Sequence, residues 1–121
     1  MVTPMANPEL VYKIATAEAV ADAHARGAFP VMPIDTADGF VHFSTASQLP
    51  ETLRLYFAGQ ENIVLLAVRA YDLGKDLVWE ASRGGQLFPH GYGDVSPAAV
   101  AWTAVISVAP DGSCPLPADV K

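Results

Sequence analysis

Residues 63–70, IVLLAVRA, form a continuous run of β-prone apolar residues interrupted by a single charge near its end. A strand with one solvent-exposed face alternates polar and apolar residues, whereas an unbroken apolar run is typical of a strand covered on both faces. The sequence therefore predicts a strand at this position with both of its faces covered.

Four further segments have the apolar patterns of strands, at residues 10–15, 39–45, 77–82 and 100–108. Two helices are expected between them. Thr16 is positioned to cap the first, which Gly27 would end, and Ser47 is positioned to cap the second. We interpret residues 29–38 as a connection because of their prolines and acidic turn residues, and residues 86–93 as a glycine-flanked loop.

These elements predict an α+β fold, a single domain with a small split or mixed β-sheet and two main helices. The chain has 121 residues and is 51% hydrophobic and 17% charged, so it is long enough for one core and too apolar for intrinsic disorder. We expect the domain to span residues 10–109. Residues 1–9 and the proline-rich residues 110–121 are expected to be peripheral tails.

The formal net charge of −6 disfavours a broad nucleic-acid surface, which needs clustered cations. The single cysteine, Cys114, permits neither an internal disulfide nor a cysteine-type zinc site. The apolar runs are too short to cross a bilayer, and the first ten residues lack the pattern of a secretory signal. We therefore expect a cytoplasmic protein that is not bound to a membrane.

Several polar residues interrupt the apolar patterns. In GFVHFST (39–45), the period of two places His42 and Ser44 on one strand face. In LVWEAS (77–82), Glu80 shares a face with Val78, and an ionised carboxylate there needs water, a partner or a ligand. The segment FPHGYG adds His90. His42, Glu80 and His90 are therefore candidates to line one cleft.

Simpler interpretations stand beside this one. His42 could be a hydrogen-bonded histidine on a half-exposed strand, and Glu80 could lie on a solvated face, paired with Arg69 or Arg83. A metal-dependent enzyme using His42 and His90 with Glu80 is chemically allowed as a set of two histidines and one carboxylate, although no metal-ligand spacing supports it. A third hypothesis is a non-catalytic module that binds a small ligand or a protein partner.

The blocks DGFVHFST, LVWEAS and FPHGYG, with the opening VYKI and the helix that contains Gln48, Thr52 and Tyr56, resemble a family of bacterial and plant proteins. That family is known as domain of unknown function 952. The resemblance extends from about residue 10 to residue 108. The family pattern FPHLYG stands here as FPHGYG, with Gly91 in place of a larger apolar residue.

The resemblance implies a fold similar to that of the ADP-ribosyltransferases, in which a split sheet holds NAD in a central cleft. It implies that Glu80 is the catalytic carboxylate, which would face the positive charge that develops as nicotinamide leaves. It implies that His42 and Ser44 bind ribose or phosphate. The first strand, where that superfamily usually has its key histidine, carries Lys13, a further candidate for ligand binding.

By the same analogy, Tyr92 or Tyr56 would stack on nicotinamide, and Arg83 and His90 would meet the pyrophosphate. The leading functional hypothesis is binding of NAD or a related small, nucleotide-like ADP-ribosyl compound. NAD would then be a substrate rather than a resident cofactor, and transferase or hydrolase activity is the corresponding catalytic hypothesis.

Overall fold

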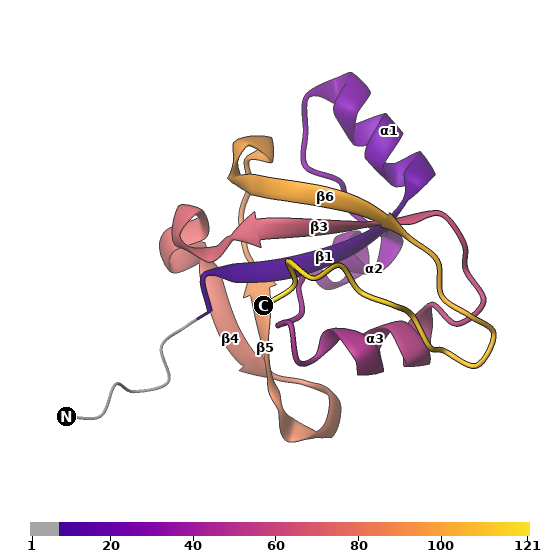
Figure 1. Ribbon diagram of the computed structural model, residues 1–121. Helices are drawn as coiled ribbons and strands as arrows, with labels where there is room; N and C mark the ends of the chain where they lie inside the picture. Colours follow the sequence, from indigo (N-terminus) through magenta and orange to yellow (C-terminus); the bar gives the residue numbers. More distant parts are fainter. Residues whose placement is uncertain (1–7) are drawn as a thin grey trace.

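The computed structural model describes residues 8–121, except for the side chain of Arg83. Six strands in this part of the chain form two three-stranded antiparallel sheets (Figure 1). The first sheet has β3 (Ile63–Arg69) between β1 (Leu10–Thr16) and β6 (Val100–Ile106). The second has β5 (Leu87–Gly91) between β2 (Val41–His42) and β4 (Leu77–Ala81). The α+β class is confirmed, and because every described strand pair is antiparallel the sheet is split but not mixed.

Strand β3 is buried on both faces, as its apolar run predicts. Val64 and Leu66 pack on one side with Phe43, which precedes the junction of the two sheets. Leu65 packs on the other side with Leu53 of helix α3 (Leu49–Tyr56). The first sheet therefore has the second sheet on one face and α3 on the other, and the burial of apolar surface on both faces of β3 stabilises this arrangement.

Helix α1 (Ala17–Arg26) has the predicted ends. The Thr16 hydroxyl accepts a hydrogen bond from the Ala19 N–H at 3.1 Å, and Gly27 ends the helix in the left-handed region at φ 65°. The predicted cap of α3 was wrong by one residue. Gln48, rather than Ser47, precedes the helix, and the Gln48 N–H donates to the Thr45 hydroxyl at 3.2 Å.

Both predicted connections contain regular structure. Residues 29–38 include a short helix, α2 (Pro33–Asp38), in whose first turn Pro33 needs no N–H partner. Residues 86–93 include β5, the central strand of the second sheet. The interpretation of this segment as a glycine-flanked loop was therefore wrong. Proline is rare in central strands, yet β5 contains Pro89.

The second sheet tolerates Pro89 because of where its backbone faces. The Pro89 carbonyl accepts from the Phe43 N–H at 3.0 Å, beyond the end of the two-residue strand β2. In an antiparallel ladder the N–H and C=O of one residue face the same neighbour. The missing N–H of Pro89 therefore falls where regular pairing with β2 has already ended.

Three 3₁₀ segments connect the strands, namely η1 (Ala70–Asp76), η2 (Arg83–Gly85) and η3 (Pro97–Ala99). The C-terminal segment runs along β1 and α3 (Figure 1), where Leu116 and Val120 pack against the core and the Lys121 N–H donates to the Tyr12 hydroxyl at 3.0 Å. Most of the expected N-terminal tail, residues 1–7, lies outside the described residues. None of the helices described reaches the length and apolar character needed to traverse a bilayer.

Gly91 provides a test of the packing between β5 and the core. A Cβ atom at this buried position would lie 2.8 Å from the Phe43 ring, closer than carbon atoms can approach without displacement. We expect Gly91→Ala to lower the free energy of unfolding by roughly 1–3 kcal/mol, measured by urea denaturation. In a Phe43→Leu background the same substitution should cost clearly less. Equal costs in the two backgrounds would show that the Phe43 ring is not what excludes a side chain there.

Candidate functional site

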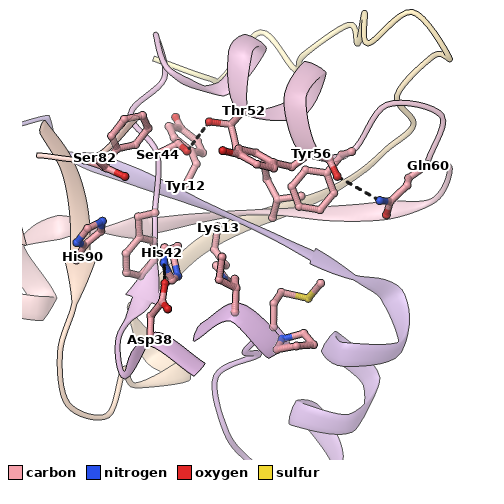
Figure 2. Close-up of a pocket in the computed structure, with 17 residues that line it drawn as sticks. Tyr12, Lys13, Asp38, His42, Ser44, Thr52, Tyr56, Gln60, Ser82 and His90 are labelled. Atoms are coloured by element: carbon pink, nitrogen blue, oxygen red, sulfur yellow. Dashed lines mark hydrogen bonds and ion pairs between the residues drawn. The ribbon is translucent and has the colours of Figure 1, made fainter. Parts of the chain in front are cut away.

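A pocket of about 500 Å³ lies where the two sheets meet α2 and α3 (Figure 2). Five of the eight side chains predicted from the sequence line it: Lys13 of β1, His42 of β2, Ser44, Tyr56 of α3 and His90 of β5. These residues are far apart in the chain, and the strand pairing brings them to one space. In particular, His42 and His90 are direct partners in the β2–β5 ladder.

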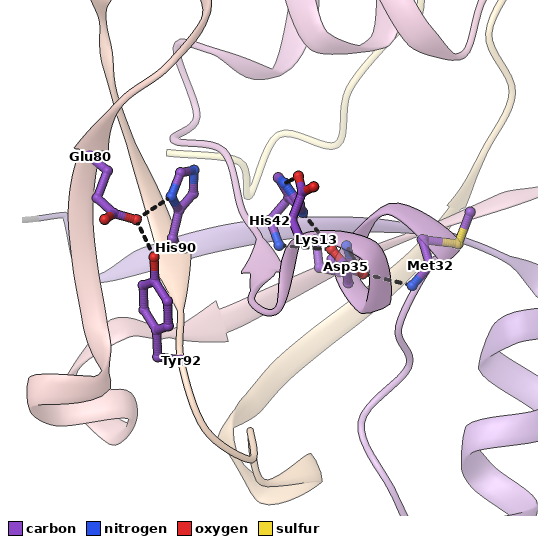
Figure 3. Close-up of polar contacts among 8 residues, drawn as sticks. Lys13, Met32, Asp35, His42, Glu80, His90 and Tyr92 are labelled. Atoms are coloured by element: carbon purple, nitrogen blue, oxygen red, sulfur yellow. Dashed lines mark hydrogen bonds and ion pairs between the residues drawn. The ribbon is translucent and has the colours of Figure 1, made fainter.

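Two predicted residues do not line this pocket. Glu80 is hydrogen-bonded to both His90 and Tyr92 (Figure 3), and one carboxylate oxygen of Glu80 lies 2.7 Å from His90 Nδ1. The Tyr92 hydroxyl donates to the same oxygen at 2.7 Å. The backbone of Arg83 belongs to η2, and its side chain lies outside the described structure. Glu80 therefore contacts a pocket residue without lining the pocket itself.

The Asp35 carboxylate organises the other side of the site, and the sequence analysis did not identify it as a site residue. Its two oxygens accept hydrogen bonds from Lys13 Nζ at 2.6 Å and from the Met32 N–H at 2.6 Å. They also accept the His42 backbone N–H at 2.9 Å and lie 2.8 Å from His42 Nδ1. The side chains of Lys13 and Asp35 are no more than 3% exposed, so this is a buried ion pair.

Electrostatics keep Asp35 ionised despite its burial. Burial alone would raise the pKa of the Asp35 carboxyl, but the Lys13 ammonium and the hydrogen bonds from Lys13, Met32 and His42 outweigh it, and the pKa is lowered. The result is a fixed negative charge beneath the pocket. It holds both Lys13 and His42 in place.

His42 lies between two carboxylates. Its Nδ1 faces Asp35, and its Nε2 lies 3.0 Å from a carboxylate oxygen of Asp38, the last residue of α2. An ionised carboxylate can only accept hydrogen bonds. Both ring nitrogens of His42 therefore lie within hydrogen-bond distance of an acceptor.

His90 has a different environment. Its side chain is 7% exposed, and Phe40 stacks on its ring at a centroid distance of 4.1 Å. Hydrogen bonds from His90 and then from Tyr92 lower the pKa of Glu80, and the contact with Glu80 raises the pKa of Tyr92. His90 lines the pocket, and Glu80 occupies its Nδ1.

Ser44 marks the junction of the two sheets. Its backbone exchanges two hydrogen bonds with Tyr12 of β1, at 2.8 and 2.9 Å. Its hydroxyl lies 3.2 Å from that of Thr52 on α3. This bridge places the end of the GFVHFST segment against β1, which explains why His42 and Ser44 share the pocket with Lys13.

The metal hypothesis finds no support in this geometry. Among the residues that the structure describes, no group of three or more His, Cys, Asp or Glu side chains is placed to hold a metal ion. The rings of His42 and His90 stand edge to face with centroids 5.6 Å apart. Three of their four ring nitrogens face carboxylate oxygens of Asp35, Asp38 and Glu80.

A local signal for Asp35 was present in the sequence. Pro33 is typical of a first helical turn, and an acidic residue two positions later can accept the N–H that precedes the helix. That signal predicts a cap and nothing more. The contacts to Lys13 and His42 depend on the tertiary fold, so their existence could not be inferred from the spacing.

The buried ion pair leads to a stability prediction. Removing one partner of such a pair leaves the other charge uncompensated, so Asp35→Asn should lower the free energy of unfolding by roughly 3–5 kcal/mol in urea denaturation. The matched control is Asp22→Asn, which breaks the exposed Asp22–Arg26 pair and should cost less than about 1 kcal/mol. Similar costs for the two variants would contradict the stabilising role of Asp35.

A pH dependence follows from the direction of the Asp35 shift. Because the folded state lowers the pKa of this carboxyl from 3.8, its contribution to stability is complete above that value and is lost as the pH falls towards the folded-state pKa. Between about pH 5 and pH 2, wild-type protein should therefore lose more stability than Asp35→Asn. Thermal unfolding followed by circular dichroism would measure this, and parallel pH profiles would contradict it.

Comparison with other proteins places the chain in a family. The family described as "Protein of unknown function (DUF952)" matches residues 14–103. The crystal structure of protein CC0527 from Caulobacter crescentus is 44% identical to the chain, with 88% of this chain and 93% of that one covered and a TM-score of 0.81. A solution NMR structure of CC0527 is 45% identical, with 87% and 90% covered and a TM-score of 0.75. A search of curated proteins gives no match. The chain belongs to the DUF952 family.

Proposed function

We propose that this domain binds a small nucleotide-like ligand, of the ADP-ribosyl type, in the pocket between its two sheets. The observation that carries the proposal is the convergence of Lys13, His42, Ser44 and His90 from separate elements on one pocket. Its volume of about 500 Å³ lies within the range of small-molecule sites, roughly 300–1,000 Å³.

The wall of the pocket combines two kinds of surface. Lys13 and His42 supply donors suited to phosphate or ribose oxygens, and the Ser44 hydroxyl can both donate and accept. Phe88 and Tyr56 supply ring surfaces, with Tyr56 61% exposed at the rim of the pocket. A nucleoside phosphate has this same division between a polar chain and a flat ring.

An ADP-ribosyltransferase-like reaction with NAD as substrate is the finer form of this proposal. It rests on the motif resemblance and on a pocket at the junction of a split sheet. In this form Glu80 acts on the ligand through His90, because its carboxylate contacts His90 and Tyr92. Glu80 is then a positioning residue.

Titration of NAD, ADP-ribose and AMP into the protein tests the proposal by calorimetry and ligand-observed NMR. We expect saturable binding of at least one of them, weakened at least 10-fold by His42→Ala because that substitution removes a donor from the pocket wall. The matched control is His24→Ala, on the exposed surface of α1, which should bind like wild type.

Three results would decide the matter. Binding that depends on His42 and not on His24 supports the nucleotide pocket. Binding that is equal in both variants places the ligand elsewhere and contradicts the proposed site. No binding of the three compounds contradicts the proposed ligand class.

A further inference from the structure

The two histidines of the pocket differ in the hydrogen-bond partners of their ring nitrogens. Each has a carboxylate at Nδ1, Asp35 for His42 and Glu80 for His90 (Figure 3). His42 has a second carboxylate, Asp38, at Nε2. With a carboxylate at each ring nitrogen, His42 is placed to donate a proton. His90 faces Glu80 with Nδ1, so Nε2 is the nitrogen with which it would accept one.

The rings of His42 and His90 are in edge-to-face contact. His42 and His90 are opposite each other in the β2–β5 ladder, and their ring centroids are 5.6 Å apart. Phe40 contacts both rings, at centroid distances of 4.5 Å and 4.1 Å, and restricts their rotation. A proton donor and a proton acceptor are thus held on neighbouring strands, facing one pocket.

We propose that this pair performs general acid–base hydrolysis of a nucleoside phosphodiester, with His90 as base and His42 as acid. The proposal rests on the nucleotide pocket proposed above and specifies its substrate. An acid is needed when the leaving group is an alkoxide, as in a phosphodiester, whereas nicotinamide leaves NAD as a neutral base. Lys13 and His42 line the pocket, and each is paired with the Asp35 carboxylate.

The step balances with water as the second reactant. His90 Nε2 takes a proton from water as the water oxygen forms a bond to phosphorus. The bond from phosphorus to a ribose oxygen breaks, and that oxygen takes the bond's electron pair and the proton from His42 Nε2. For this transfer the Asp38 side chain, which is 45% exposed, moves away from His42 Nε2. The leaving oxygen then takes its place. Exchange with solvent then restores both histidines.

Hydrolysis of 2′,3′-cyclic AMP, followed by ³¹P NMR, tests the reaction. We expect conversion to a phosphomonoester, slowed at least about 100-fold by His90→Ala and by His42→Ala, the loss typical of a missing general acid or base. His24→Ala should leave the rate unchanged. Binding of 2′,3′-cyclic AMP would be measured on the same samples, so that a loss of binding can be distinguished from a loss of hydrolysis.

The role of Glu80 has its own readout, which requires no ligand. In ¹⁵N-histidine spectra of the wild type, the neutral His90 ring should carry its hydrogen on Nδ1, held there by Glu80. Glu80→Ala should move it largely to Nε2, the tautomer that an unconstrained histidine side chain favours in water. Tyr92→Phe is the matched control: it removes the other donor to Glu80, and should leave the His90 tautomer unchanged.

Each outcome bears on the inference. Hydrolysis that depends on both histidines, with His90 protonated at Nδ1, supports it. Binding of 2′,3′-cyclic AMP without hydrolysis, or cleavage of NAD alone, overturns this inference but not the proposed nucleotide pocket. An Nε2–H tautomer of His90 in the wild type overturns it independently of any ligand. If 2′,3′-cyclic AMP, NAD and ADP-ribose all fail to bind, both proposals are overturned.

Discussion

The Asp35 carboxylate is the interaction on which the pocket depends. It accepts a backbone hydrogen bond at the start of α2, a second from β2, and side-chain contacts from Lys13 and His42. Burying an ionised carboxylate has a high free-energy cost unless both of its oxygens have partners. Loss of one of these contacts is therefore expected to weaken the others. Because the partners come from β1, the α2 cap and β2, the same requirement that makes the carboxylate tolerable fixes the relative placement of the pocket walls.

The second sheet supplies the other half of the site through strand register. His42 and His90 are opposite each other, and Glu80 is paired with Phe88, one diagonal step from His90. A long side chain can cross such a diagonal, and Glu80 does so to reach Nδ1. A shift of one residue in either strand would turn the histidine to the core face. Next to His90, the absence of a side chain at Gly91 leaves room for the Phe43 ring, because a Cβ atom there would lie 2.8 Å from it.

Much of the local structure was open to prediction from the sequence. The alternation in GFVHFST places His42 and Ser44 on one strand face, and both line the pocket. Phe43, on the other face, belongs to the core and also lines the pocket. The predictions failed where tertiary contacts override local preference. The glycines that flank residues 86–93 suggested a loop, yet β5 is a central strand because β2 and β4 pair with it on either side. Residues 29–38 suggested a connection, yet the cap and burial of Asp35 stabilise a helical turn at residues 33–38.

The sequence by itself determined the α+β class, the doubly buried strand β3 and the strand face that carries His42 and Ser44. These follow from periodicity, which is a property of neighbouring residues. Only the tertiary structure decided that Lys13 pairs with Asp35, and that Glu80 contacts His90 without lining the pocket. Those partners are 22 and 10 residues apart in the chain. Local patterns contain no information about such pairings, because they depend on which strands become neighbours and in which register.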